Sequence, residues 1–185
     1  MARHVDHVLA LLPFEPPYMT AAGMSCDFVG HPVVAEALAS PDEVAAFAGA
    51  GPLVLALPGS RRGEVTRLMP VLGEAIAASG TVSLELAANG CPMVIAYDMH
   101  PLTLWLMRRA ARIDTVTLVN LVSDTRVVPE FIGARCRADL ILPAVEALLA
   151  DPSGQAEAMA LTMGRLGRGG EAPGLRAARS VLSAI

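Results

Sequence analysis

Short apolar segments alternate along this chain with segments whose apolar residues recur at helical spacing. Runs of this length, bounded by proline, glycine or asparagine, are typical of buried strands. The predicted strands are residues 7–13, 26–29, 53–57, 93–97 and the β-branched segment 114–118. Because helices are expected between them, the pattern indicates an α/β protein with a parallel sheet.

The helical segments carry recognisable start and stop signals. Residues 40–43 have the Ser-x-x-Glu form of a capping box with proline at the first helical position. Asn89 and Gly90 end a helix that opens at 79–81. Further helices are expected after Pro16, within 65–76, and over 101–112, 129–132, 138–150, 152–166 and 175–185, with a glycine hinge at 167–170.

Composition narrows the class of protein. Hydrophobic residues make up 54% of the 185 residues and charged residues 17%, whereas about 25% charged is usual. This balance excludes a disordered chain or a coiled coil. The net charge of −4 gives no global basic field for nucleic acid. The longest apolar runs fall short of the ~20 residues that cross a bilayer.

No metal site or disulfide framework is predicted. Cys26, Cys91 and Cys136 are odd in number and far apart, which suits a reducing cytoplasm. His4, His7 and His31 have no metal-ligand spacing, and no Ser-His-Asp arrangement can be argued.

The segment 53–64, LVLALPGSRRGE, predicts an anion site. A strand, a Pro-Gly-Ser turn and a helix start direct free backbone N–H groups outward, and the helix dipole favours negative charge. The guanidinium of Arg61, next to Ser60, matches the geometry of a diphosphate. The alternative is an ordinary turn between strand and helix with solvated arginines.

The segment 79–85, SGTVSLE, predicts a second polar helix start. Ser79 or Thr81 can cap the helix and also donate to a phosphate oxygen. Glu85 lies four residues after Thr81 on the same helical face, where its carboxylate can accept two hydrogen bonds from a ribose diol. A capped helix with a surface glutamate remains the alternative.

Two further segments suggest contacts. Leu104 and Trp105 lie beside Arg108, Arg109 and Arg112, which fits a helix at a membrane interface, although a core helix with a solvated basic end fits equally well. Asn120 follows the predicted strand 114–118, at the strand end where α/β sheets place ligands, unless it only caps a helix.

Seven strings occur in an order that resembles one family. They are VLALLPFE (8–15), FVGHP (28–32), LPGSR (57–61), SGTVSLE (79–85), HPLTLW (100–105), VNL (119–121) and VPE (128–130). Together they resemble the bacterial lipid-A-disaccharide synthases, glycosyltransferases of the GT-B fold that act in lipopolysaccharide synthesis. The resemblance implies an α/β, Rossmann-like, parallel-sheet C-terminal half that binds the sugar donor, here incomplete.

The resemblance also implies a reaction. A 2,3-diacylglucosamine unit passes from its UDP donor to 2,3-diacylglucosamine 1-phosphate (lipid X), giving the lipid A disaccharide 1-phosphate and UDP, without metal or cofactor. Ser60, Arg61, Ser79, Gly80 and Thr81 would contact the diphosphate, Glu85 the ribose and Asn120 the sugar-donor site. The expected location is cytoplasmic, peripheral at the inner-membrane surface.

The resemblance also predicts the organisation of the chain. Residues 1–30 correspond to the end of an acceptor domain, 31–170 to the UDP-sugar domain with an internal deletion near 74–78, and 171–185 to a C-terminal helix. Because the family's catalytic base lies in the acceptor domain, no catalytic residue is assigned and we expect an inactive fragment.

The deletion leaves apolar sheet edges, which predict a homo-oligomer or aggregation. Two other functions remain open. One is a non-catalytic remnant that binds a nucleotide sugar or a membrane surface. The other is a different GT-B relative, although such relatives lack the HPLTLW and VNL strings.

Overall fold

The computed structural model describes residues 4–48, 82–98 and 114–184, together with Leu55, Leu57 and Trp105. The elements in chain order are β1 (His7–Ala10), α1 (Pro16–Ala21), β2 (Ser25–Phe28), the 3-10 turn η1 (Pro32–Ala35), α2 (Pro41–Ala48), α4 (Val82–Ala88), β3 (Ile95–Tyr97), α6 (Leu118–Ser123), β4 (Glu130–Ile132), the 3-10 turn η2 (Gly133–Arg135), α7 (Ala138–Ala150), α8 (Ser153–Arg165) and α9 (Pro173–Ala184).

The described strands form two parallel pairs. β1 pairs with β2 from His7 opposite Ser25 to Ala10 opposite Phe28, and α1 lies in the connection between them. β3 pairs with β4, with Ile95 opposite Glu130. Parallel neighbours need a crossover connection of a dozen or more residues, which both pairs have. The predicted fold class, α/β with parallel strands, is therefore confirmed.

Several predicted boundaries are confirmed. α7 spans 138–150 as expected, and α8 and α9 lie within two residues of their predicted limits. The capping box at the start of α2 forms, since Ser40 N donates to Glu43 Oε2 at 2.8 Å and Glu43 N donates to Ser40 Oγ at 3.3 Å. Gly90 has a φ of +63°, which suits the glycine predicted to end α4.

Two predicted elements are wrong. Residues 114–117 form no strand, because the N–H groups of Val116 and Thr117 donate to the Glu130 carboxylate instead of to a neighbouring strand, and α6 then begins at Leu118. Residues 130–132 are strand β4, not a helix. Ile95 N donates to the carbonyl oxygen of Pro129 at 2.9 Å, and this bond joins β4 to β3.

The predicted strand 53–57 lies mostly outside the described residues. Leu55 has no regular structure and is 43% exposed, so the prediction of burial is wrong there. Leu57, by contrast, forms a single β-bridge and is half-buried, so part of the predicted strand is paired.

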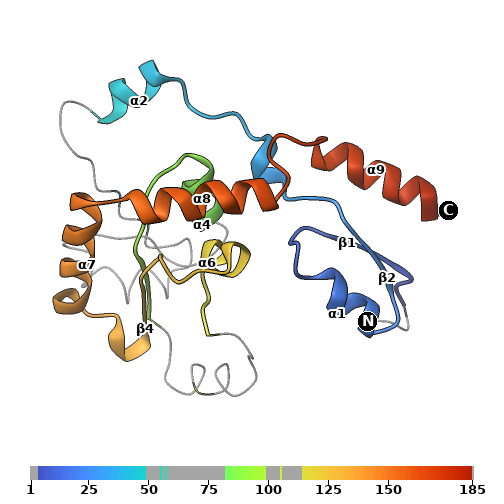
Figure 1. Ribbon diagram of the computed structural model, residues 1–185, viewed down its shortest axis with the longest axis horizontal. Helices are drawn as coiled ribbons and strands as arrows, with labels where there is room; N and C mark the ends of the chain where they lie inside the picture. The colour runs from blue at the N-terminus through green and yellow to red at the C-terminus, as the bar shows by residue number, and fades with distance from the viewer. Residues whose placement is uncertain are drawn as a thin grey trace.

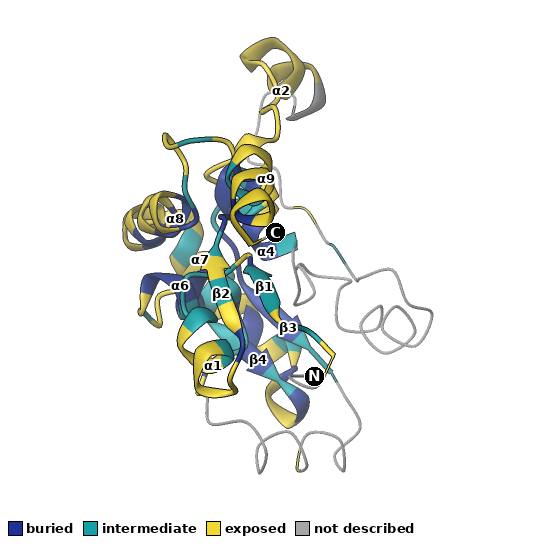
Figure 2. Ribbon diagram, turned by 90° about the vertical axis from the view of Figure 1, so that its right-hand side faces the viewer, coloured by how far each residue is buried: buried dark blue, intermediate teal, exposed yellow. Residues whose placement is uncertain are grey.

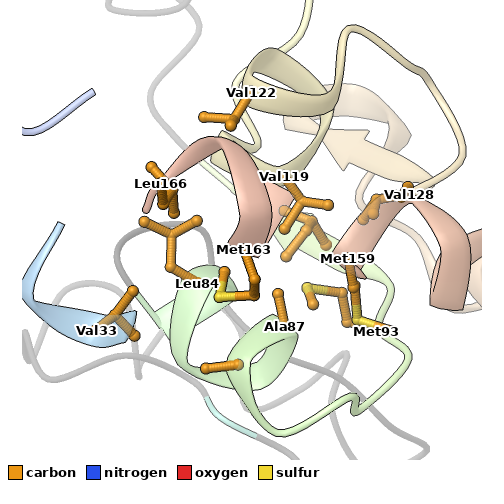
Figure 3. Close-up of a cluster of buried hydrophobic side chains, with 13 residues drawn as sticks. Val33, Leu84, Ala87, Met93, Val119, Val122, Val128, Met159, Met163 and Leu166 are labelled. Atoms are coloured by element: carbon orange, nitrogen blue, oxygen red, sulfur yellow. The ribbon is translucent and has the colours of Figure 1, made fainter. Parts of the chain in front are cut away.

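The largest core cluster joins distant parts of the sequence. α4 packs against α6, α8 and η1. Leu84, Val119 and Leu166 have no exposed surface and meet in this cluster, as Figure 3 shows. A smaller cluster packs α7 onto the β3–β4 pair through Val94, Phe131 and Ile141. Figure 2 shows buried residues concentrated on the inner sides of these helices.

Helix α9 contacts the β1–β2 pair. In Figure 1, β1, β2, α1 and α9 lie at one end of the molecule, α7 lies at the other, and α6 lies between them beside α8. Ser180 of α9 donates to Asp27 Oδ2 at 2.6 Å and lies 2.7 Å from His7 Nε2. A guanidinium nitrogen of Arg176 also donates to the carbonyl oxygen of Phe28. These polar contacts dock α9 against both strands.

Candidate functional site

The predicted site residues are only partly described. Ser60, Arg61, Ser79, Gly80 and Thr81 lie outside the described residues, as do Leu104, Arg108, Arg109 and Arg112. Glu85, Asn120 and Trp105 are described. The proximity of the two predicted diphosphate turns therefore stays a prediction, and the geometry of the site rests on α4, α6 and their surroundings.

Glu85 lies on the exposed side of the first turn of α4. Its neighbour Leu84 is fully buried against α6 and α8, so the helix is fixed and Glu85 faces away from the core. The Asn89 side chain donates to the main-chain oxygen of Glu85 at 2.8 Å and closes the last turn. An acidic side chain in the first turn of a helix interacts favourably with the dipole.

Asn120 is a buried residue of α6 and does not directly follow a strand, contrary to the prediction. It is 1% exposed. Its amide nitrogen donates to Thr115 Oγ1 at 3.2 Å and to the carbonyl oxygen of Val128 at 2.9 Å, and its oxygen accepts from Val128 N at 3.0 Å. Since both amide hydrogens are used within the protein, the structure shows Asn120 positioning the 115–117 segment and β4.

Glu130 is a polar residue whose role the sequence reasoning missed. Its carboxylate accepts from Val116 N at 3.1 Å, from Thr117 N at 2.8 Å and from the Thr115 hydroxyl. The contacts fix the start of α6, where the Thr117 hydroxyl is buried and has no hydrogen-bond partner among the described residues. The only sequence signal for Glu130 was its place in the Val-Pro-Glu string.

A cavity of about 280 Å³ borders this network. Its lining includes Asn120, Glu130, Arg126 and Arg135. Arg126 Nε donates to Asp114 Oδ2 at 3.0 Å, and this ion pair holds the pKa of the Asp114 carboxyl below its ordinary value. The cavity therefore has side chains of both charges on its rim.

His31 was not predicted to bind a metal ion. It follows β2, and its backbone contacts Leu166 at the C-terminal end of α8. Gly30 before it has a φ of +89°, and a Cβ there would lie 2.9 Å from the carbonyl oxygen of Leu166, so only glycine fits. His31 N donates to that same oxygen at 3.2 Å, and His31 Nδ1 accepts from Val33 N at 3.2 Å. The Gly-His-Pro string after a strand was the available signal.

His31 makes stability depend on pH. Burial lowers the pKa of its imidazole below the ordinary value of 6.5, despite the opposing charges of Glu36 and Glu15. As pH falls below about 6.5, the unfolded chain takes up a proton that the folded chain resists, so stability decreases. We expect the free energy of unfolding, measured by urea denaturation from pH 7.5 to 5, to fall less steeply in His31→Asn. Parallel curves for the two proteins would contradict this.

Trp105 is helical and 58% exposed. Its neighbours in the predicted basic helix lie outside the described residues, so the membrane-interface role stays a prediction. Among the described residues, none of the helices combines the length and the apolar character needed to cross a membrane. Within the same residues, no group of three or more His, Cys, Asp or Glu side chains is arranged to hold a metal ion.

Parallel strand pairs covered by helices define the class of the chain as an α/β protein. Comparison with known proteins gives its family. The family model described as "Lipid-A-disaccharide synthetase" matches residues 1–76 and 72–166. The chain belongs to the lipid-A-disaccharide synthase family, and this identifies it as a member of a bacterial glycosyltransferase family of lipid A biosynthesis.

Three curated relatives, each named lipid-A-disaccharide synthase, match all of this chain. The protein of Ruegeria pomeroyi is 47% identical, that of Rhodospirillum centenum 36% and that of Rhodopseudomonas palustris (strain HaA2) 33%. The chain spans 63%, 62% and 63% of their respective lengths.

The alignment with the Ruegeria protein extends over 253 positions, whereas this chain has 185 residues. The two segments matched by the family model meet at 72–76. The internal deletion near 74–78 stays a prediction.

Proposed function

We propose that this chain derives from a lipid-A-disaccharide synthase and retains part of the site for the UDP-linked sugar. The full reaction of such an enzyme would transfer 2,3-diacylglucosamine from UDP to lipid X and release UDP. The observation that carries the proposal is the family match over the whole chain, including the LPGSR and SGTVSLE strings.

Each proposed binding residue has a distinct role. Arg61 and Ser60 would contact the diphosphate, since a guanidinium pairs with phosphate through two parallel hydrogen bonds. Ser79, Gly80 and Thr81, which immediately precede α4, would add hydroxyl and backbone N–H donors. Glu85, exposed in the first turn of that helix, would accept from the ribose hydroxyls. Asn120 would act at the same site indirectly, by holding the 115–117 segment and β4 in place.

The proposed activity of this chain alone is binding without turnover. No residue of the chain is assigned as catalytic base, and the deletion near 74–78 is proposed to remove part of the uridine pocket. A transfer assay with UDP-diacylglucosamine and lipid X is expected to give no disaccharide. Turnover by this chain alone would reject the proposal of an inactive fragment.

Replacing Arg61 by alanine is expected to weaken UDP binding by roughly 1.5–3 kcal/mol, because a charge-assisted hydrogen bond to the diphosphate is lost. Isothermal titration with UDP measures the change. Arg137→Ala is the matched control, since Arg137 is exposed and pairs with Asp139 at the start of α7. Equal affinities for Arg61→Ala and the unmodified chain would reject the assignment of Arg61.

A non-catalytic membrane-binding remnant is the second candidate, favoured by the exposed Trp105. Trp105 would lie at the inner-membrane surface with Leu104, Arg108, Arg109 and Arg112. Formation of a homo-oligomer would cover exposed apolar surface. A pure membrane module ignores UDP, whereas the sugar-nucleotide site binds it. UDP titration therefore separates the two candidates.

A further inference from the structure

We propose that the docking of α9 on the β1–β2 pair is coupled to the binding of a proton by His7, so that this helix is released as pH rises. The groups that make the contact come from three elements, His7 from β1, Asp27 from β2 and Ser180 from α9. The inference does not rest on the proposed function, because the sugar-nucleotide residues lie on other segments of the chain.

Polar contacts, and not buried apolar surface, hold most of α9 in place. Of its residues only Pro173 and Ser180 are buried, whereas Leu175 and Leu182 are 58% and 75% exposed. A net intramolecular hydrogen bond stabilises a fold by roughly 0.5–1.5 kcal/mol. Because few apolar side chains anchor the helix, the loss of one such bond should change its docking measurably.

The hydrogen bonds around His7 can all form at once only when its ring carries two protons. The Ser25 hydroxyl donates to the carbonyl oxygen of Asp6 at 2.9 Å and lies 2.8 Å from His7 Nδ1. The Ser180 hydroxyl donates to Asp27 Oδ2 at 2.6 Å and lies 2.7 Å from His7 Nε2. Each hydroxyl has one hydrogen, and in both cases an oxygen that can only accept takes it. Both ring nitrogens must therefore donate, as they do in the imidazolium ion.

A neutral His7 ring cannot keep this set of contacts. One of its nitrogens is then only an acceptor, so Ser25 or Ser180 must turn its hydroxyl hydrogen toward the ring and give up its present acceptor. The attraction between the charged ring and the Asp27 carboxylate, whose Oδ2 lies 3.7 Å from Nε2, is lost as well. The docked helix therefore favours the protonated ring, and docking and protonation are linked.

The direction of the pH dependence follows from the group that titrates. An imidazole ordinarily titrates near about 6.5 and a carboxylate near about 4, so between pH 6 and pH 8 the charge changes on His7 and not on Asp6 or Asp27. Since docking favours the protonated ring, it is strongest below about pH 6.5 and weakens as pH rises above that value.

The other charged groups on the elements packed around His7 have contacts of their own. Arg176 of α9 donates to a main-chain oxygen of β2, and Arg179 pairs with Glu171 at 2.9 Å. Helix α1, which packs on β2, carries no charged side chain, and its one tyrosine ordinarily titrates near about 10. Burial raises the pKa of the Cys26 thiol on β2, so this group stays neutral in the same range.

Hydrogen–deuterium exchange of the full chain at pH 6.0 and pH 8.0, corrected for the pH dependence of intrinsic exchange, tests the coupling. The protection factor of the α9 amides is expected to be about three- to tenfold lower at pH 8.0. Helix α7 packs on the β3–β4 pair and reports whether the rest of the chain stays folded. Equal or higher protection of α9 at pH 8.0 would overturn the proposal.

Three variants assign the effect to this cluster. His7→Gln cannot take up a proton and should give the same α9 protection at both pH values. His4→Gln is the matched control, since His4 is an exposed histidine of the same segment, and it should keep the full pH difference. In Asp27→Asn the amide oxygen can still accept from Ser180, but the negative charge is gone, so the pH difference should shrink. An undiminished difference in His7→Gln or Asp27→Asn, or its disappearance in His4→Gln, would reject the role of His7.

Discussion

Replacement of Leu84 by alanine is expected to lower the free energy of unfolding by about 2–5 kcal/mol. Leu84 has no exposed surface and lies in the cluster where α4 meets α6 and α8. Truncation removes buried apolar surface and leaves a cavity among helices that relax only partly, so both effects act in the same direction. Urea denaturation followed by circular dichroism measures the change.

Leu86→Ala is the control for this experiment. Leu86 is on the same helix and packs on the same cluster but is only partly buried. Its truncation should therefore lower the free energy of unfolding clearly less than that of Leu84. Leu84→Met, which nearly conserves volume, should cost less than about 1.5 kcal/mol. If both alanine variants lose equal stability, the cluster does not hold α4 in the way described, and the placement of Glu85 loses its support.

Local signals in the sequence predicted the elements that depend on local contacts. The capping box of α2 joins residues three apart, and α7 follows from an apolar periodic segment between Arg137 and Asp151. β1 and β2 are short apolar runs ended by turn residues, so their positions were also predictable. The capping box and α7 depend on interactions within a few residues, whereas β1 and β2 were found from their apolar runs although they pair with each other 18 residues apart.

The wrong predictions depend on contacts between residues far apart in the sequence. The β-branched segment 114–118 has the composition of a strand, but the Glu130 carboxylate satisfies its N–H groups from more than ten residues away. Residues 130–132 form a strand because β3 pairs with them across a long connection. No local pattern encodes either contact, so propensity alone gave the wrong element.

Only part of the candidate site could be predicted from the sequence. Glu85 was found because a capped helix start and a family string coincide there, and the structure places it exposed on α4. His31 and Glu130 have no periodic or metal-like pattern around them. Their roles come from Leu166 in one case and from Thr115 to Thr117 in the other, which only the folded chain brings close.

Replacement of Asn120 by leucine is expected to lower the free energy of unfolding by about 3–5 kcal/mol. The substitution leaves the N–H and carbonyl groups of Val128 buried without their present partners, at roughly 1–3 kcal/mol for each group. It also removes the bond to Thr115, which helps to hold the Glu130 network together. Urea denaturation, followed by the fluorescence of Trp105, measures the loss.

Asn89→Leu is the matched control, because Asn89 is exposed and its only described side-chain hydrogen bond is to the main-chain oxygen of Glu85. This substitution should lower the free energy of unfolding by less than about 1 kcal/mol. UDP titration of the same variants separates two roles for Asn120. A positioning role predicts that stability and UDP affinity fall together in Asn120→Leu. A loss of UDP affinity with unchanged stability would instead mean that Asn120 contacts the nucleotide directly, and that its bonds to Val128 are energetically unimportant.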